Sequence, residues 1–119
     1  MNRLTFCFFA LATSFKLAAA AMPGTESIVG DPELGKVKSA ACSACHGADG
    51  NSLVPLWPKI AGQHSKYIQL QLYNFSLGEG GPRHNVQMYP FAVGLSDQDR
   101  ADLGAYYAGQ KTQYAESEN

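Results

Sequence analysis

The sequence has too few cysteines and too little charge of one sign to support several common classes of protein. Its 119 residues include only three cysteines, so no disulfide framework can be built and no second cysteine pair completes a zinc ribbon. The formal net charge of −1 argues against nucleic-acid binding, which normally requires a basic face. The length is that of a single domain, and we expect its function to depend on a few chemically distinctive residues.

The chain also has no apolar run long enough to cross a membrane, although residues 1–21 have the three parts of a secretory signal peptide. An arginine near the start precedes the apolar residues 4–12, and a run of alanines ends at Ala21. This apolar stretch is far shorter than the ~20 residues that a membrane helix needs, and Lys16 closes it. We therefore expect export and cleavage at the end of the alanine run. The alternative to cleavage is that this segment remains as an uncleaved anchor. Within the segment, Cys7 is interpreted as a small hydrophobic residue.

Beyond this segment we expect one folded domain with short flanks. Residues 22–30 are predicted to be a flexible lead-in, residues 31–112 the domain, and residues 113–119 a polar tail. The first helix of the domain should begin at the N-cap Asp31 and run directly into Cys42. It would carry one apolar stripe, formed by Leu34, Val37 and Ala41.

Two further helical patterns complete an all-α prediction. The second helix is expected from His64 to Leu77, and the third begins at a capping box formed by Ser96 and Asp99. Their apolar stripes are Ile68, Leu72 and Phe75 in the second helix, and Leu103, Tyr107 and Tyr114 in the third. We expect the third helix to cross the first near Gly35, with Gly104 easing that crossing; the alternative is that Gly35 is a tolerated surface glycine.

The most distinctive motif is the Cys-Ser-Ala-Cys-His run at residues 42–46. This spacing is the attachment signature of c-type haem, in which Cys42 and Cys45 form thioether bonds and His46 binds the iron. A thioredoxin-like redox pair would need a strand before the motif, and no strand-like run is present. A zinc site would need a further ligand, from His64 or His84. The export signal fits the compartment where haem is attached, so the sequence favours covalent haem.

The loop that follows the motif offers candidate neighbours for the haem. Two prolines stiffen it and allow it to cover one haem face. The carbonyl of Pro55 is a candidate acceptor for the second ring nitrogen of His46; the alternative is that Pro55 only shapes the loop. Trp57 offers an apolar body and one N–H that could reach a haem propionate, and plain core packing is the alternative.

A second loop, residues 83–94, offers candidates for a sixth iron ligand. Met88 is the only methionine after Met22, although a lone methionine is usually core filler. His84 is the competitor and would give bis-histidine iron. Two neighbours, Arg83 and Asn85, could hold a propionate or the methionine loop, and solvent exposure explains them equally well.

Several motifs together resemble class I cytochrome c. They are Cys-Ser-Ala-Cys-His-Gly-Ala-Asp-Gly-Asn-Ser, Trp-Pro-Lys-Ile-Ala-Gly-Gln-His, Met-Tyr-Pro-Phe-Ala and Gly-Leu-Ser-Asp-Gln-Asp, and they span nearly all of residues 31–110. The pattern is most similar to bacterial periplasmic cytochromes of the di-haem "c-four" type and their small mono-haem relatives. A di-haem member would carry a second C-x-x-C-H motif, and this sequence has one.

The resemblance implies a class I cytochrome c fold, with three to four main helices around one haem. It implies iron ligation by His46 and Met88, and a hydrogen bond from His46 to the carbonyl of Pro55. With both axial positions filled by protein, no site is open to substrate, and thioether ligation raises the reduction potential. The expected role is therefore electron transfer and not catalysis.

From these features we expect a periplasmic mono-haem carrier of single electrons between respiratory redox proteins, such as a membrane-bound oxidase or a dehydrogenase. The exposed haem edge should be ringed by Ala44, residues 87–91 and residues 53–57, and the contacts with partners should be small and weak. One alternative is a haem-bearing subunit of an oxidoreductase complex. Another is a haem enzyme or sensor with a labile sixth ligand.

Overall fold

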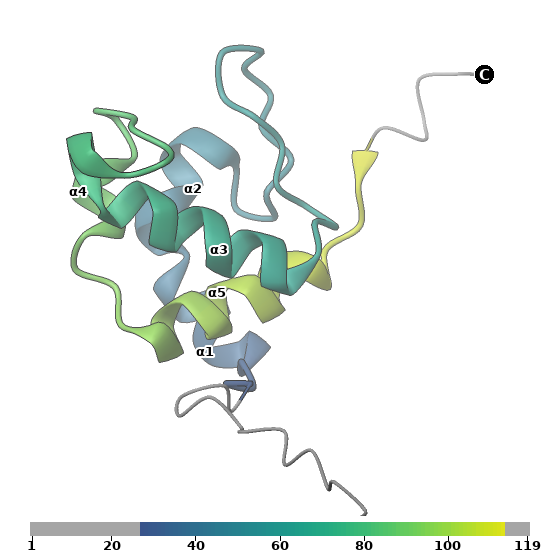
Figure 1. Ribbon diagram of the computed structural model, residues 1–119. Helices are drawn as coiled ribbons and strands as arrows, with labels where there is room; N and C mark the ends of the chain where they lie inside the picture. Colours follow the sequence, from purple (N-terminus) through teal and green to yellow (C-terminus); the bar gives the residue numbers. More distant parts are fainter. Residues whose placement is uncertain (1–26, 114–119) are drawn as a thin grey trace, which may run out of the picture.

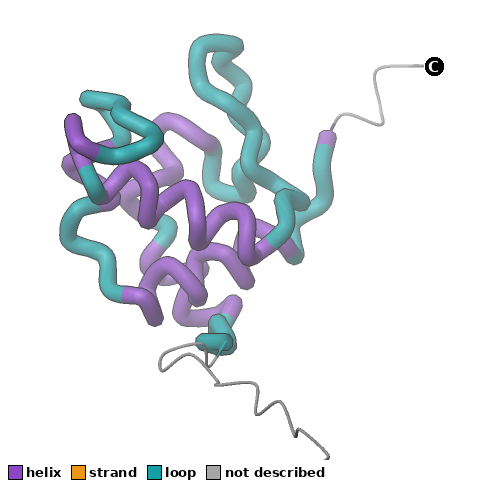
Figure 2. Tube along the Cα trace, in the orientation of Figure 1, coloured by secondary structure: helices purple, strands orange, loops and turns teal. Residues whose placement is uncertain are grey.

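The computed structural model describes residues 27–113, and this part of the chain is helical and contains no strand (Figure 2). The predicted signal peptide at 1–21, most of the predicted lead-in, and residues 114–119 lie outside the described residues. The elements are, in order, α1 (Pro32–Lys38), α2 (Ala40–His46), α3 (Ser65–Ser76), the 3₁₀ turn η1 (Gly78–Gly80), α4 (Tyr89–Ala92) and α5 (Asp97–Ala108). The all-α prediction is confirmed.

The closing helix α5 packs against both α1 and α3 (Figure 1). A Cβ atom added at Gly35 would lie 2.0 Å from the carbonyl oxygen of Asp102 and 2.8 Å from the Cβ of Tyr106. The predicted crossing of the closing helix over the first at Gly35 is therefore confirmed. Gly104 was expected at the same crossing but faces α3, where a Cβ would lie 2.7 Å from the carbonyl oxygen of Ser65. Each glycine thus permits one close helix contact.

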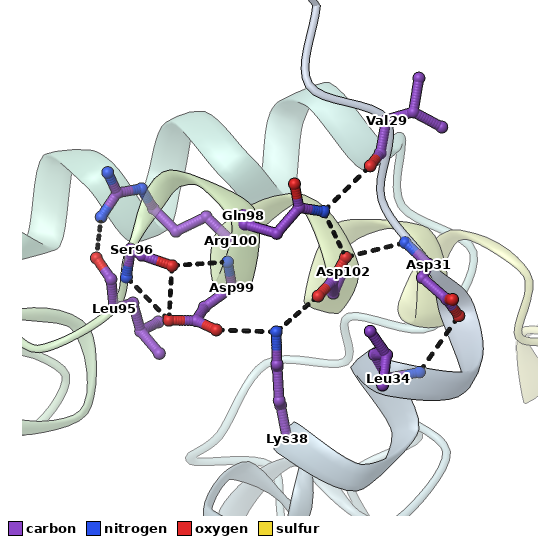
Figure 3. Close-up of polar contacts among 10 residues, drawn as sticks. All are labelled: Val29, Asp31, Leu34, Lys38, Leu95, Ser96, Gln98, Asp99, Arg100 and Asp102. Carbon is purple, nitrogen blue, oxygen red and sulfur yellow. Dashed lines mark hydrogen bonds and ion pairs between the residues drawn. The ribbon is translucent and has the colours of Figure 1, made fainter.

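A buried carboxylate joins α1 to α5 beside this crossing (Figure 3). Asp102 is 0% exposed and accepts hydrogen bonds from the backbone N–H of Asp31 and the side-chain amide of Gln98, each at 2.8 Å. The ammonium of Lys38 lies 2.5 Å from Asp102 and 2.7 Å from Asp99. The Asp31 N–H and the Lys38 charge hold the pKa of the Asp102 carboxyl below its usual range, because both stabilise the ionised form.

The predicted starts of the first and closing helices are confirmed by their caps. The Asp31 carboxylate accepts hydrogen bonds from the backbone N–H groups of Glu33 (2.8 Å) and Leu34 (3.2 Å) at the start of α1. At the start of α5, the Ser96 hydroxyl accepts from the Asp99 N–H at 3.1 Å, and the Asp99 carboxylate accepts from the Ser96 N–H at 2.9 Å. This reciprocal pair is the predicted capping box.

Two expectations for the first helix are wrong. The helix is interrupted at Ser39, whose hydroxyl donates to the carbonyl of Lys36 at 2.7 Å, a local bond that competes with the regular helical pattern. The predicted apolar stripe is also largely solvent-facing, since Leu34 is 51% and Val37 74% exposed. The reason is that α1 turns its Gly35 face toward α5, which leaves the stripe on the outside.

The hydrophobic core lies where α3 and α5 meet. Its buried members are Ile68, Leu103 and Tyr107, and the partly buried Cys42 and Leu72 pack against them. The predicted apolar stripe of α3 is confirmed. Its residues line a large cavity, and this places the core directly against the site described next.

Candidate functional site

A cavity of about 660 Å³ lies between α2, α3, α5 and the two long loops. This volume is typical of a pocket for a large organic ligand. Most of the lining side chains are apolar, and none of the described residues that line the cavity is acidic. The charged residues in the lining are Lys59 and Arg83, and both are basic. The cavity therefore suits a large apolar group with negatively charged edges.

Helix α2 delivers the haem-attachment motif to this cavity. Cys42, Cys45 and His46 all line it, because residues three and four positions apart share one face of a helix. Neither cysteine is in a disulfide, and both are partly buried. Burial raises the pKa of the Cys42 thiol, because the charged thiolate is disfavoured away from water. Both sulfur-bearing side chains therefore line the cavity, and no disulfide joins them.

His46 is 7% exposed and is held by one hydrogen bond: its Nδ1 lies 2.8 Å from the carbonyl oxygen of Pro58. A carbonyl can only accept, so Nδ1 carries the proton and Nε2 keeps the lone pair that a metal ion requires. The prediction that Pro55 supplies this acceptor is wrong. Pro55 is exposed and does not line the cavity. A turn closed by the Trp57 N–H and the Val54 carbonyl (3.1 Å) redirects the chain, and Pro58 lies just beyond it.

The second loop brings Met88 to the same cavity as His46. The side-chain oxygen of Asn85 accepts hydrogen bonds from the backbone N–H groups of Gln87 (2.9 Å) and Met88 (3.0 Å). This Asx turn fixes the backbone around the methionine. His84, the competing ligand predicted from the sequence, is exposed and does not line the cavity. The structure thus gathers His46 and Met88 and leaves His84 outside.

The remaining predicted neighbours of the haem are Trp57, Arg83 and the residues expected at the exposed haem edge. Trp57 lines the cavity and is partly buried, as expected of a haem neighbour. Arg83 is held at the cavity because its guanidinium donates to the Gln71 side chain at 2.5 Å and lies 4.9 Å from the ring centre of Phe75. Of the predicted haem edge, residues 56, 57, 87, 88, 90 and 91 line the cavity, whereas residues 44, 53, 54, 55 and 89 do not.

Sequence analysis did not assign three residues of the site, namely Pro58, Lys59 and Tyr107. Pro58 was not singled out, although it is the second of the two prolines that shape the loop. Tyr107 was assigned only to the helical stripe, yet it lines the cavity. The paired prolines were the available signal for Pro58, but spacing alone does not say which carbonyl reaches His46.

These residues fit a covalently attached haem. Two thiols can form thioether bonds, while an imidazole Nε2 and a methionine sulfur are suitable axial ligands for haem iron. The basic pair of side chains suits the propionates, and the apolar lining suits the macrocycle. Within residues 27–113, no group of three His, Cys, Asp or Glu side chains is placed to hold a metal ion, so the zinc alternative has no ligand set there.

Comparisons with known proteins agree with this chemistry. Residues 33–110 match the family described as cytochrome c. The chain is 54% identical over 83 residues to cytochrome c4 from Thiocapsa roseopersicina, covering 69% of this chain and 41% of that protein. It is 39% identical over 82 residues to cytochrome c-554(548) from Halomonas halodenitrificans, covering 69% of this chain and 99% of that protein.

The fold comparison gives the same result. The crystal structure of reduced recombinant cytochrome c4 from Pseudomonas stutzeri has a TM-score of 0.67 and 43% identity, covering 71% of this chain and 47% of that chain. The chain thus spans less than half the length of these cytochrome c4 relatives. Since the family match extends over most of the chain and includes the attachment motif, the chain belongs to the cytochrome c family.

Proposed function

We propose that this protein is a periplasmic mono-haem cytochrome c that carries single electrons between larger respiratory redox proteins. Membership of the cytochrome c family supports a role in electron transfer rather than in catalysis. The observation that carries the finer proposal is that His46 and Met88 line the same cavity as both attachment cysteines.

Each of these residues has a distinct task. Cys42 and Cys45 would hold the haem through thioether bonds, and His46 and Met88 would supply the two axial ligands. Bound in this way, the haem provides a one-electron iron couple. The Pro58 carbonyl orients His46 and makes its Nε2 a stronger donor, while the Asn85 turn keeps the Met88 loop in place. Two protein ligands leave no position for a substrate.

The mouth of the cavity supports transient contact with redox partners. Leu56 and Val86 line the cavity and are each 74% exposed, and Phe91 is 49% exposed. Arg83 adds positive charge to this apolar rim. Electron-transfer contacts are small and weak, so a limited apolar rim of this kind suits brief contact with a redox partner.

Two features support the periplasmic and mono-haem parts of the proposal. The signal-like residues 1–21 point to export. The single C-x-x-C-H motif and the 99% coverage of cytochrome c-554(548) are consistent with one haem. Separately, no helix within residues 27–113 has the length and apolar character needed to cross a membrane.

The test uses protein purified from the periplasm of a host that attaches haem. We expect its mass to be that of the processed polypeptide plus one haem, retained under denaturing conditions. We also expect the reduced protein to leave carbon monoxide unbound at neutral pH, since Met88 fills the sixth position. Prompt binding of carbon monoxide would contradict a pure carrier and would favour a haem enzyme or sensor.

A further inference from the structure

Tyr107 carries a buried polar atom that the proposed mechanism does not use. The residue is 2% exposed, and its hydroxyl has no hydrogen-bond partner among the residues that the structure describes. Buried hydroxyl groups are nearly always paired, because leaving a donor unsatisfied away from water is unfavourable. This hydroxyl therefore needs an acceptor that the polypeptide by itself does not offer in good geometry.

The surroundings of Tyr107 leave few choices of acceptor. Cys42 packs against the core cluster that contains Tyr107, and both residues line the haem cavity. Burial raises the pKa of the Tyr107 hydroxyl, and the side chains of Cys42 and Ser39 also influence that pKa, which indicates that both are near the hydroxyl. Neither of them is its hydrogen-bond partner in the structure. The Ser39 hydroxyl donates to the Lys36 carbonyl at 2.7 Å, and its oxygen can still accept, but its chemistry does not change when haem is attached. The sulfur of Cys42 is the neighbour whose chemistry does change.

We infer that Tyr107 is a positioning residue for the haem, its hydroxyl donating a hydrogen bond to the Cys42 sulfur once that sulfur is a thioether. The inference rests on the covalent haem of the proposed function. A thiol carries its own proton, whereas a thioether sulfur can only accept. Attachment also fixes the sulfur in one place, so the buried hydroxyl gains a permanent acceptor at the edge of the macrocycle.

Such a bond has an electronic consequence. The hydroxyl points the positive end of its dipole toward the attached sulfur in a water-poor environment, where dipoles act strongly. The reduced haem carries less positive charge than the oxidised haem, so this dipole favours the reduced form. Hydrogen bonds near a redox centre adjust its potential in this way. Tyr107 should accordingly raise the reduction potential.

The adjacent tyrosine on α5 provides a matched control. Tyr106 has its ring centre 5.0 Å from that of Tyr107, but its hydroxyl donates to the Ala48 carbonyl at 2.8 Å, and it does not line the cavity. Tyr107→Phe and Tyr106→Phe therefore each remove one hydroxyl from the same helix. Only the first removal should affect the haem.

The experiment measures the midpoint potential of the haem-loaded protein and of both variants. We expect Tyr107→Phe to lower the potential by an amount equivalent to about a two- to tenfold change in the ratio of oxidised to reduced protein, the range for one hydrogen bond. Tenfold corresponds to about 59 mV for one electron. Tyr106→Phe should leave the potential unchanged. Equal potentials in Tyr107→Phe and the wild type would overturn the inference.

A measurement on the wild-type protein tests the inference even if the Tyr107→Phe variant does not fold. Proton NMR of the reduced holoprotein should show a slowly exchanging Tyr107 hydroxyl proton in contact with the side-chain protons of Cys42. A hydroxyl proton directed at Ser39, or one without protection from exchange, would overturn the inference. If the purified protein carries no haem, both the proposed function and this inference are contradicted. If the protein carries haem but the Tyr107 hydroxyl proton exchanges rapidly, only this inference is contradicted.

Discussion

The contact between α1 and α5 at Gly35 gives the sharpest stability prediction. In Gly35→Ala the new Cβ would lie 2.0 Å from the carbonyl oxygen of Asp102, about 1.4 Å closer than ordinary van der Waals contact at 3.4 Å. The nearest atoms include the backbone of α5, which cannot move aside as a flexible side chain can. The two helices must therefore separate, and this also strains the hydrogen bond from the Asp31 N–H to the Asp102 carboxylate.

The magnitude follows from two opposing effects. Overpacking usually costs about 1–3 kcal/mol, and a clash with rigid backbone belongs at or above the upper end. Replacing a helical glycine by alanine recovers about 1 kcal/mol of helix propensity. We therefore expect a net loss of at least about 2 kcal/mol in the free energy of unfolding. For a domain of this size, that loss lowers the melting temperature by about 8–16 °C.

The assay is thermal and denaturant unfolding of the haem-loaded protein, followed by circular dichroism. Gly94→Ala is the control, because a Cβ there would meet no atom within 4 Å and its φ is not positive. It should be neutral or stabilising by up to about 1 kcal/mol, since alanine restricts the unfolded chain. A Gly35→Ala protein within about 0.5 kcal/mol of the wild type would refute the direct backbone contact.

Two further predictions concern the charged cluster and the methionine loop. Lys38 is the largest cause that holds the pKa of Asp99 below its usual range, so the stability from this pair is present above about pH 4 and is lost as the pH falls further. Lys38→Met should therefore be less stable than the wild type at pH 7 and lose less stability on acidification, as measured by denaturant unfolding. If the unfolding free energies of the two proteins changed with pH in parallel, the pairing would be contradicted. Asn85→Ala removes the acceptor for the Met88 N–H, so cyanide should displace Met88 from the ferric iron faster than in the wild type. Asn85→Asp keeps the acceptor oxygen and should resemble the wild type, whereas equal rates in all three proteins would contradict a role for the turn.

Most of the features that the sequence predicted correctly depend on local chemistry. The capping box of Ser96 and Asp99 needs only residues three positions apart, and the stripe of Ile68 and Leu72 needs only helical periodicity. The shared helix face of the attachment motif likewise follows from its spacing. Such patterns can be predicted because no distant segment has to be placed first.

The features that the sequence did not predict depend on how distant segments of the chain meet. Pro55 and Pro58 were chemically equivalent acceptors for His46, and only the turn before Pro58 decides between them. Asp102 was not expected in the interior, since aspartate is mostly exposed unless it is paired. Its partner Asp31 lies 71 positions away in the sequence, so the pairing becomes visible only once α1 and α5 have crossed.

The central claim is that His46 and Met88 together close the coordination of a covalently attached haem iron. The most direct test is the absorption spectrum of the oxidised holoprotein, compared with those of Met88→Ala and His84→Ala. We predict a methionine-to-ferric-iron charge-transfer band in the wild type and in His84→Ala, and its loss in Met88→Ala. A wild-type spectrum without that band, or a band that persists in Met88→Ala, would contradict the claim.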